Sequence, residues 1–290
     1  MENGLDSALF REELEYYGLS GEGAGLIREK DGVIVTRVPW KNGTAVLKCF
    51  EDEEFRREIR NYGILRSCGI PTIEVLGQSE RSILLEDIDA SDTWRLGAEE
   101  DFENPEVIRA IAKWYKTLHT NGMEYVRQHG AGMYEEWDCF TRENIEAIRE
   151  KFSLQDSEGL KELADHYTEL RKRMDAAPRT LTYNDFYYTN MVVRKDHTAA
   201  MMFDYNLLGK GNCITDLRNV TYWFSEENKE VFFSVYGKPD KELELLDRIT
   251  SPVVTLCSAM KRDIFPDWAE EAVGELARLP KLITELKEKN

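Results

Sequence analysis

Alternating apolar and polar positions in the first third of the chain predict a small antiparallel sheet. The run VIVTRVPWKNGTAVLKCF carries Asn42-Gly43 between two β-rich stretches, and this dipeptide is a strong signal for a hairpin turn. After Pro71, the segments TIEVLGQS and RSILLEDIDAS predict two further strands of the same sheet. The stretch from Glu86 to Ser91 then predicts a connection to a second lobe.

A helix is predicted between these strands, over EDEEFRREIRNYGILRSCGIP. Acidic residues fill its first turn, where the helix dipole favours them, and Gly69 and Pro71 follow its end. Its apolar stripe also contains Glu58, while Lys48 shares an apolar strand face with Val46. Since a lone charge on an apolar face is costly, we expect Lys48 and Glu58 to pair. A lysine that guards an edge strand against aggregation is the alternative.

The rest of the chain is predicted to be mainly helical. Asn104-Pro105 opens an amphipathic helix that we expect to end at Gly122, with His119 in its last turn. A histidine there packs and stabilises the helix dipole, and a catalytic role for it is the less favoured alternative. Further helices are predicted at Thr141–Phe152, at Lys161–Met174 and after Asp216.

The stretch LTYNDFYYTNMVV places Asp185 and Asn190 five residues apart in a polar, aromatic turn between apolar runs. Together with AAMMFDYN it predicts a hairpin whose turn is centred near His197, so that Asn190 faces Asp204. Side-chain oxygens at the open end of such a hairpin suit a hard cation, and Mg²⁺ commonly takes one or two carboxylates plus substrate phosphates. A turn without further role is the alternative, because Asn and Asp are common in loops.

Composition limits the partners of the chain. The formal net charge of −17 over 290 residues argues against nucleic acid, because neutralising phosphates needs clustered Lys and Arg. This charge would favour a cationic substrate, although acidity that serves only solubility is the commoner explanation. No window approaches the roughly 18 apolar residues of a membrane span, and the acidic N-terminus is unlike a secretory leader, so we expect a cytoplasmic protein without membrane contact. The cysteines have no C-x-x-C spacing and predict neither disulfides nor zinc; they are Cys49, Cys68, Cys139, Cys213 and Cys257.

Taken together, these features resemble the protein-kinase-like fold, and more closely the small-molecule kinases of the aminoglycoside phosphotransferase and choline kinase superfamily. The resemblance implies an α+β, two-lobed fold. A small antiparallel-sheet N-lobe with one helix (1–88) would bind the nucleotide, and a larger, mainly helical C-lobe (89–290) would carry catalysis and substrate binding. The matching segments are AVLK with Lys48, EIRNYGIL with Glu58, IAKWYKTLH with His119, LTYNDFYYTN with Asp185 and Asn190, MMFD with Asp204, and ITDLRN with Asp216.

For the nucleotide, ATP or GTP, the resemblance implies that Lys48 binds the α- and β-phosphates and that Glu58 orients this lysine. It also implies contacts of the nucleotide with Val46 and Glu86. Two glycine-containing segments are candidates for the loop that covers the phosphates, SGEGAG (Ser20–Gly25) and EKDG (Glu29–Gly32). EKDG stands where a tight turn between the first two strands is expected.

For the chemistry, the resemblance implies that Asp185 accepts the proton of the attacking hydroxyl and that Asn190 and Asp204 hold Mg²⁺. Asp216 would brace the catalytic loop. The segment between Asp204 and Asp216 is too short for a peptide-docking platform, so the expected acceptor is a small hydroxylated molecule. Aminoglycoside-like, choline-like and sugar- or amino-acid-like acceptors all stay open, and a cage of Tyr187, Tyr188, Tyr222, Trp223 and Trp268 around a quaternary ammonium is a minority alternative to core packing.

The chain also departs from this family at two places. Tyr183-Asn184 stands where His-Gly is usual, and a phenol can donate a hydrogen bond as the imidazole would. Asn206 stands where an acid is frequent, which would weaken metal affinity. These departures motivate an alternative function, a nucleotide-binding protein with weak or no catalysis.

Overall fold

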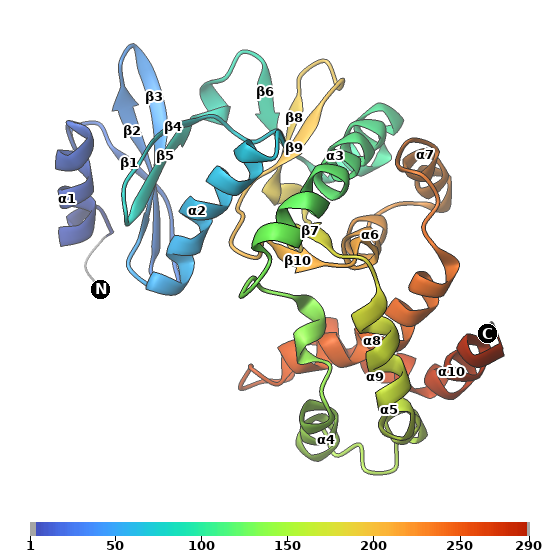
Figure 1. The fold of residues 1–290 in the computed structure, drawn as a ribbon. Coiled ribbons are helices and arrows are strands. Elements are labelled where there is room, and N and C mark those ends of the chain that lie inside the picture. Colours follow the sequence, from blue (N-terminus) through green and yellow to red (C-terminus); the bar gives the residue numbers. More distant parts are fainter. Residues whose placement is uncertain (1–3, 289–290) are drawn as a thin grey trace.

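The structure, a computed structural model, describes residues 4–288, so the outermost residues of the two expected lobes lie outside it. The N-lobe is a five-stranded antiparallel sheet in the order β1-β2-β3-β5-β4, and a mainly helical C-lobe follows it (Figure 1). The α+β fold class is thus confirmed, whereas the boundary at 88/89 stays a prediction. The strands of the sheet are β1 (Gly25–Lys30), β2 (Val33–Trp40), β3 (Gly43–Phe50), β4 (Val75–Gln78) and β5 (Ser82–Glu86).

Tight turns join the first three strands. Asp31 and Gly32 connect β1 to β2 with φ of 53° and 72°, so the tight turn expected within EKDG is confirmed. Between β2 and β3, Trp40 pairs with Gly43, so the two turn residues are Lys41 and Asn42. The hairpin is present, but the turn predicted at Asn42-Gly43 was wrong by one residue. Lys41 adopts a φ of 50°, a conformation that the prediction expected at glycine.

The two faces of the sheet are covered by different helices (Figure 1). Helix α1 (Ala8–Tyr17), which the sequence pattern did not predict, packs its Leu9, Phe10 and Leu14 on one face. The predicted helix after β3 is confirmed as α2 (Glu53–Ser67), which follows the N-cap Asp52 and packs into the second core, shared with the C-lobe. The sheet is therefore covered on one side by α1 and joined to the C-lobe on the other.

Helix α3 (Pro105–His129) crosses the C-lobe and is longer than expected. Asn104 caps it and Pro105 occupies its first turn, as predicted, but the helix continues past Gly122. A Cβ at Gly122 would lie 2.7 Å from the Cβ of Leu181, so this glycine permits close packing instead of ending the helix. His119 therefore lies in the middle of α3, and the expectation that it ends the helix was wrong.

Short strands and further helices complete the C-lobe. Strand β7 (Thr180–Thr182) pairs with β10 (Gly209–Gly211), and β6 (Trp94–Leu96) extends the hairpin of β8 (Met191–Arg194) and β9 (Ala200–Met202). None of the helices within residues 4–288 is long and apolar enough to cross a membrane. The remaining helices, of which the first two confirm predictions, are α4 (Arg142–Lys151), α5 (Glu158–Ala176), α6 (Cys213–Thr221), α7 (Glu226–Tyr236), α8 (Lys241–Ala259), α9 (Glu270–Glu275) and α10 (Leu279–Glu288).

The β8–β9 hairpin is confirmed, but its register differs from the prediction. Val193 pairs with Ala200 and Met191 with Met202, so the turn is centred half a residue before His197. The backbone oxygen of Asn190 accepts the N–H of Phe203, at 3.0 Å. The prediction that Asn190 faces Asp204 was therefore wrong by one residue. The prediction assumed a turn symmetric about His197, whereas the hairpin has a four-residue loop that begins after Arg194, whose N–H donates to the carbonyl of Ala199.

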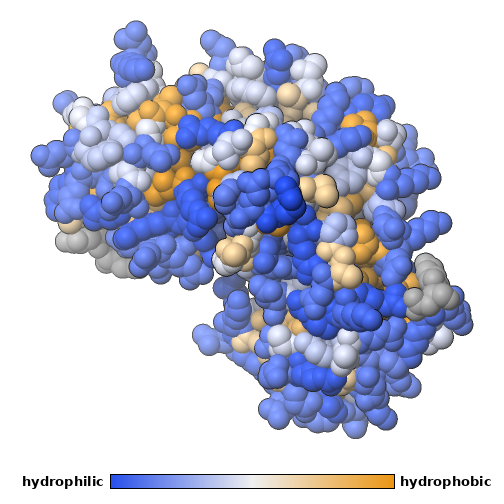
Figure 2. Space-filling model, in the orientation of Figure 1, coloured by the Kyte–Doolittle hydropathy of each residue, from blue (hydrophilic) through white to orange (hydrophobic). Residues whose placement is uncertain are grey.

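Polar and charged side chains cover most of the face drawn in Figure 2, and apolar residues appear there in scattered patches. This agrees with the composition of the chain, which has 55 acidic and 38 basic residues. Acidity of this kind distributed over the surface gives solubility and repels polyanions.

Candidate active site

Lys48 joins the two lobes through a pair of carboxylates. Its Nζ lies 2.6 Å from Oε2 of Glu58 on α2 and 3.0 Å from Oδ1 of Asp204, which follows β9. The side chains of Lys48 and Glu58 are 10% and 1% exposed, so the predicted pairing of two buried charges is confirmed. Burial disfavours the ammonium ion, but the charges of Glu58 and Asp204 outweigh it and raise the pKa of Lys48 above its ordinary value.

A cavity of about 90 Å³ opens beside Lys48, under the β1–β2 hairpin. Three of its side chains are cations, Arg28 and Lys30 from β1 and Lys48 from β3, which suits a polyphosphate. Val46 points to the same side of β3 as Lys48, and Glu86 ends β5 opposite Ala45, but neither lines this cavity. The lining residues are Arg28, Lys30, Asp31, Val33, Val35, Lys48, Phe55, Asp204 and Asn206.

Asp185 lies in the loop between β7 and β8. Its Oδ2 accepts a hydrogen bond from Nδ2 of Asn190 at 3.0 Å, and its backbone oxygen accepts a second one at 3.1 Å. Burial, together with the negative charge of Asp204, raises the pKa of Asp185 to about 7, although Asn190 and Lys48 oppose this. A carboxylate with such a pKa is suited to accept a proton near neutral pH.

The oxygen atoms around Asp204 fit a hard cation. The nitrogen of Asn190 is bound to Asp185, which leaves its Oδ1 as a potential ligand. Asp204 directly follows Phe203, whose N–H donates to the backbone oxygen of Asn190. Asn206 donates to Asp204 at 3.4 Å, while its own Oδ1 is buried without a hydrogen-bond partner. Within residues 4–288 no three His, Cys, Asp or Glu side chains form a metal cluster. One carboxylate with amide oxygens is a ligand type that suits Mg²⁺, which commonly takes one or two carboxylates plus substrate phosphates.

Asp216 on α6 holds the backbone that leads to Asp185. Its two carboxylate oxygens accept the N–H groups of Tyr183 and Asn184, each at 2.8 Å. Nε2 of His119 lies 3.0 Å from the same carboxylate. Asp216 is fully buried. It lies where a residue that braces the loop is expected to lie.

Both residues of the departure directly before Asp185, Tyr183 and Asn184, have structural explanations. Asn184 has a φ of 65°, a conformation that asparagine tolerates better than most residues, and its side chain donates to the carbonyl of Leu207 at 2.9 Å. Tyr183 is buried, and its hydroxyl donates to the carbonyl of Phe203 at 2.5 Å. The expected phenol hydrogen bond is therefore present, and it ties the loop to the residue before Asp204.

Aromatic side chains gather beside the catalytic loop. Tyr187 lies 4.4 Å from Tyr188 and 4.9 Å from Trp223 between ring centroids, and Tyr222 lies 5.4 Å from Trp223. Phe102, from the 3₁₀ helix η3 (Glu99–Glu103), stacks against Trp223 at 6.0 Å. We call these five residues the aromatic cluster.

Three of the five rings in the aromatic cluster are exposed, whereas Phe102 is buried in the core. Tyr187 and Trp223 are 36% and 38% exposed, and Tyr222 is 66% exposed. A hydrogen bond with Tyr188, and to a smaller degree the nearby Glu99 carboxylate, raise the pKa of Tyr187. Trp268 makes no ring contact with the cluster in the described part of the chain, so four of the five aromatic residues singled out in the sequence come together.

Sequence reasoning missed several residues of the site. Arg28 and Lys30 stand two positions apart on β1 and line the cavity. Arg28 directly precedes EKDG and Lys30 lies within it, and this alternation of cations was the available signal. Phe102 carried no signal, because 121 residues separate it from Trp223 in the sequence. The contact of His119 with Asp216 was hidden by the expectation that the helix ends nearby.

A family model described as the phosphotransferase enzyme family (APH) matches residues 35–239 of the chain. A search of curated proteins finds no match. The family match covers both lobes and includes Lys48, Glu58, Asp185 and Asp204.

Several solved structures share the fold at low sequence identity. Plasmodium vivax ethanolamine kinase is 16% identical with a TM-score of 0.63, and the match covers 98% of this chain and 92% of that one. Choline kinase LicA from Streptococcus pneumoniae is 13% identical with a TM-score of 0.61, covering 95% and 97%. Spectinomycin phosphotransferase in complex with ADP and spectinomycin is 15% identical with a TM-score of 0.61, covering 93% and 92%.

Proposed function

Because this chain belongs to the phosphotransferase enzyme family, we propose that it transfers the γ-phosphate of ATP to a hydroxyl of a small organic cation, with Mg²⁺ as cofactor. The predicted superfamily, and with it the prediction of a phosphotransferase enzyme of the small-molecule kinase type, are confirmed. The donor, the metal and the acceptor are the proposed part.

The observation that carries the proposal is the position of Asp185. Its carboxylate has a pKa of about 7, is oriented by Asn190 and lies at the end of a loop held by Asp216. We propose that Asp185 accepts the hydroxyl proton of the acceptor as the new phosphoester bond forms. The protein otherwise has to position the reactants and neutralise charge, because phosphoryl transfer asks for little covalent chemistry.

For the nucleotide, the support comes from the cationic cavity. Lys48, held by Glu58, would contact the α- and β-phosphates, and Arg28 and Lys30 would reach the phosphates from the hairpin above. This favours the β1–β2 turn, and so EKDG, as the phosphate-covering loop over SGEGAG, which precedes β1. Val46 and Glu86 are proposed as contacts of the nucleobase. They do not distinguish the adenine of ATP from the guanine of GTP.

Asp204 and Asn190 would hold Mg²⁺, and the orphaned oxygen of Asn206 is available as a further ligand. When bound, Mg²⁺ would supply positive charge against the developing charge of the phosphates. The three residues act on the ion by fixing its position relative to Lys48 and Asp185.

The acceptor is proposed from the aromatic cluster. The partly exposed rings of Tyr187 and Trp223, with Glu99 close by, suit an organic ammonium group. The net charge of −17 would draw cations toward such a site. The kinases and the phosphotransferase of similar fold are named for ethanolamine, choline and spectinomycin, which all carry amino or ammonium groups.

A coupled assay of ADP formation over an acceptor panel tests this function. The panel should pair amino alcohols and aminoglycosides with neutral sugars and polyols of similar size. We expect ADP formation to depend on a cationic acceptor, and Trp223→Ala to raise its KM while leaving the KM for ATP unchanged. Turnover of the neutral acceptors alone would contradict the cation proposal.

The alternative function, nucleotide binding without catalysis, rested on Tyr183-Asn184 and Asn206. Both Tyr183 and Asn184 keep the loop in place through Asp216, so the first departure gives the alternative little support. Tight Mg-ATP binding in calorimetry together with no ADP formation for any acceptor, or with water, would favour this alternative.

A further inference from the structure

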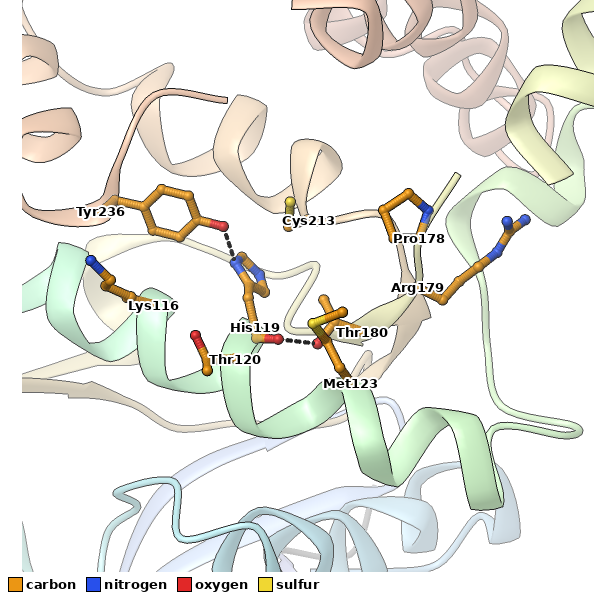
Figure 3. Close-up of a pocket in the computed structure, with 9 residues that line it drawn as sticks. All are labelled: Lys116, His119, Thr120, Met123, Pro178, Arg179, Thr180, Cys213 and Tyr236. Atoms are coloured by element: carbon orange, nitrogen blue, oxygen red, sulfur yellow. Dashed lines mark hydrogen bonds between the residues drawn. The ribbon is translucent and has the colours of Figure 1, made fainter. Parts of the chain in front are cut away.

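A second cavity, of about 270 Å³, is lined by residues of the C-lobe (Figure 3). It is formed by α3, the start of β7, the start of α6 and the end of α7, and it shares no lining residue with the cavity beside Lys48. Its size is close to the lower end of small-molecule pockets, about 300 Å³. The lining residues are Lys116, His119, Thr120, Met123, Pro178, Arg179, Thr180, Cys213 and Tyr236.

The inner wall of this cavity is connected to the catalytic loop. The hydroxyl of Tyr236 lies 2.8 Å from Nδ1 of His119 (Figure 3). Nε2 of His119 lies 3.0 Å from the carboxylate of Asp216. The Asp216 carboxylate only accepts, so Nε2–H donates to it, and in the neutral imidazole Nδ1 accepts the Tyr236 hydroxyl. Asp216 in turn holds the N–H groups of Tyr183 and Asn184. Tyr236 is therefore the side chain through which an occupant of the cavity would contact this chain of hydrogen bonds.

The charge of the lining selects the kind of occupant. None of the nine lining residues is acidic, in a chain with 55 acidic residues, and two of them, Lys116 and Arg179, are cations at opposite ends (Figure 3). Arg179 is occupied by the backbone oxygens of Met174, Asp175 and Ala177 and by a carboxylate. The Nζ of Lys116 donates to the carbonyl of Val235 at 3.0 Å, which leaves further N–H donors for an anion.

We propose that this cavity binds a small organic anion with an apolar body, such as an arylalkyl carboxylate, and that its binding loosens the hold of Asp216 on the catalytic loop. The carboxylate lies at Lys116 and accepts the Tyr236 hydroxyl, while the apolar body packs on Met123 and Pro178. Once Tyr236 donates to the ligand, Nδ1 of His119 loses its hydrogen bond. The consequence for turnover, a lower kcat at unchanged affinity for nucleotide, rests on the proposed function.

Calorimetry tests the site without any reference to activity. The probes are 4-phenylbutyrate and the neutral 4-phenylbutanol, which differ only in the charged group. We expect the carboxylate to bind more tightly, and Lys116→Gln to weaken it about two- to fivefold, as for an exposed ion pair. Lys113→Gln, an exposed lysine one turn away on α3, is the matched control and should change nothing. Thr120→Trp, at an exposed rim position, should block both probes. Equal binding of the two probes, or full binding to Thr120→Trp, would overturn the proposal.

Hydrogen exchange tests the connection to the loop. Saturating 4-phenylbutyrate should speed exchange of the Tyr183 and Asn184 amides, and Tyr236→Phe should bind the probe but lose this response. Unchanged exchange with bound probe would overturn the regulatory part. Because neither readout needs turnover, a failure here is distinct from a failure to find phosphotransfer. If phosphotransfer is found, the probe should lower kcat in the wild type and not in Tyr236→Phe.

Discussion

The Nδ2 of Asn190 lies 3.0 Å from Oδ2 of Asp185, so the side chains of the proposed base and of a proposed metal ligand are joined by a hydrogen bond. This contact turns the nitrogen of the amide toward the base and leaves its oxygen for a cation. The same bond favours the ionised form of Asp185 and so offsets part of the effect of burial on its pKa. The two roles are close in space but can be separated by substitutions at Asp185 and Asp204.

Asp185→Asn should lower turnover by roughly 10² to 10⁴ fold while leaving Mg-ATP binding nearly intact, because it removes only the proton acceptor. Asp204→Asn should weaken Mg-ATP binding and lower turnover together, since it removes a charged ligand. Titration calorimetry beside steady-state kinetics measures both. Full activity in Asp185→Asn, or loss of Mg-ATP binding in that variant alone, would show that the roles are wrong.

The raised pKa of Asp185 also has a consequence for stability. Well below pH 3.8, the ordinary pKa of this carboxyl, Asp185 is protonated in both the folded and the unfolded chain. Between about pH 4 and 7 it is largely ionised in the unfolded chain but still largely protonated in the folded one, so stability falls as pH rises. Asp185→Asn removes this cost and should stabilise the fold by roughly 1 to 4 kcal/mol at pH 8, and by less at pH 5. Urea unfolding at the two pH values measures the difference. A gain that is the same at both would mean that the carboxyl does not titrate in this range.

Lys48 and Glu58 should be energetically coupled, because removing Lys48 leaves Glu58 buried without its cation and removing Glu58 leaves Lys48 with Asp204 alone. A double-mutant cycle of Lys48→Met and Glu58→Gln on the free energy of unfolding should give a coupling of roughly 0.5 to 3 kcal/mol. Lys30→Met, which removes an exposed cation of the same cavity, is the control and should be additive with Glu58→Gln. Additivity in the first pair would mean that the ion pair does not form in solution.

Asn206 should limit the affinity for Mg²⁺, because it contributes a neutral oxygen beside the single carboxylate of Asp204. Asn206→Asp should tighten binding of Mg²⁺ about tenfold through the added ligand charge. The readout is the Mg²⁺ concentration needed for half-maximal thermal stabilisation by ATP. Asn206→Ala should shift it in the opposite direction, and a shift in the same direction for both variants would exclude Asn206 as a ligand.

Asn184→Ala should destabilise the fold by roughly 1 to 3 kcal/mol, because alanine is strained at a φ of 65° and loses the hydrogen bond to Leu207. Asn184→Gly keeps the conformation and should cost less than Asn184→Ala. Thermal unfolding of the two variants compares conformation with hydrogen bonding. An equal loss in both would assign the whole effect to the side-chain hydrogen bonds.

The parts of this molecule that could be predicted depend on local patterns. Acidic residues at the start of α2 and a glycine after its end were enough to predict that helix. Opposite charges on the apolar faces of a strand and of the next helix were enough to predict the contact of Lys48 with Glu58. The order and approximate position of the residues around Asp185 also followed from the sequence, because D-x4-N and the next apolar run lie close together in the chain.

The remainder depends on packing between distant segments. Gly122 reads as a helix end until Leu181 packs against it, 59 residues later in the chain. The register of β8 and β9 is set by a loop of four residues, and a displacement by one residue changes which side chains oppose each other. The aromatic cluster unites Phe102 with Trp223, a contact that no local pattern encodes.

The segment between Asp204 and α6 is folded into the body of the C-lobe. Gly209–Gly211 forms β10 against β7, the N–H of Lys210 donates to the carbonyl of Tyr134 at 2.8 Å, and α6 begins two residues later. Residues 205–212 therefore take up this position in the unmodified chain. The conformational entropy lost in ordering them is lost during folding, and no later phosphorylation is needed to order them.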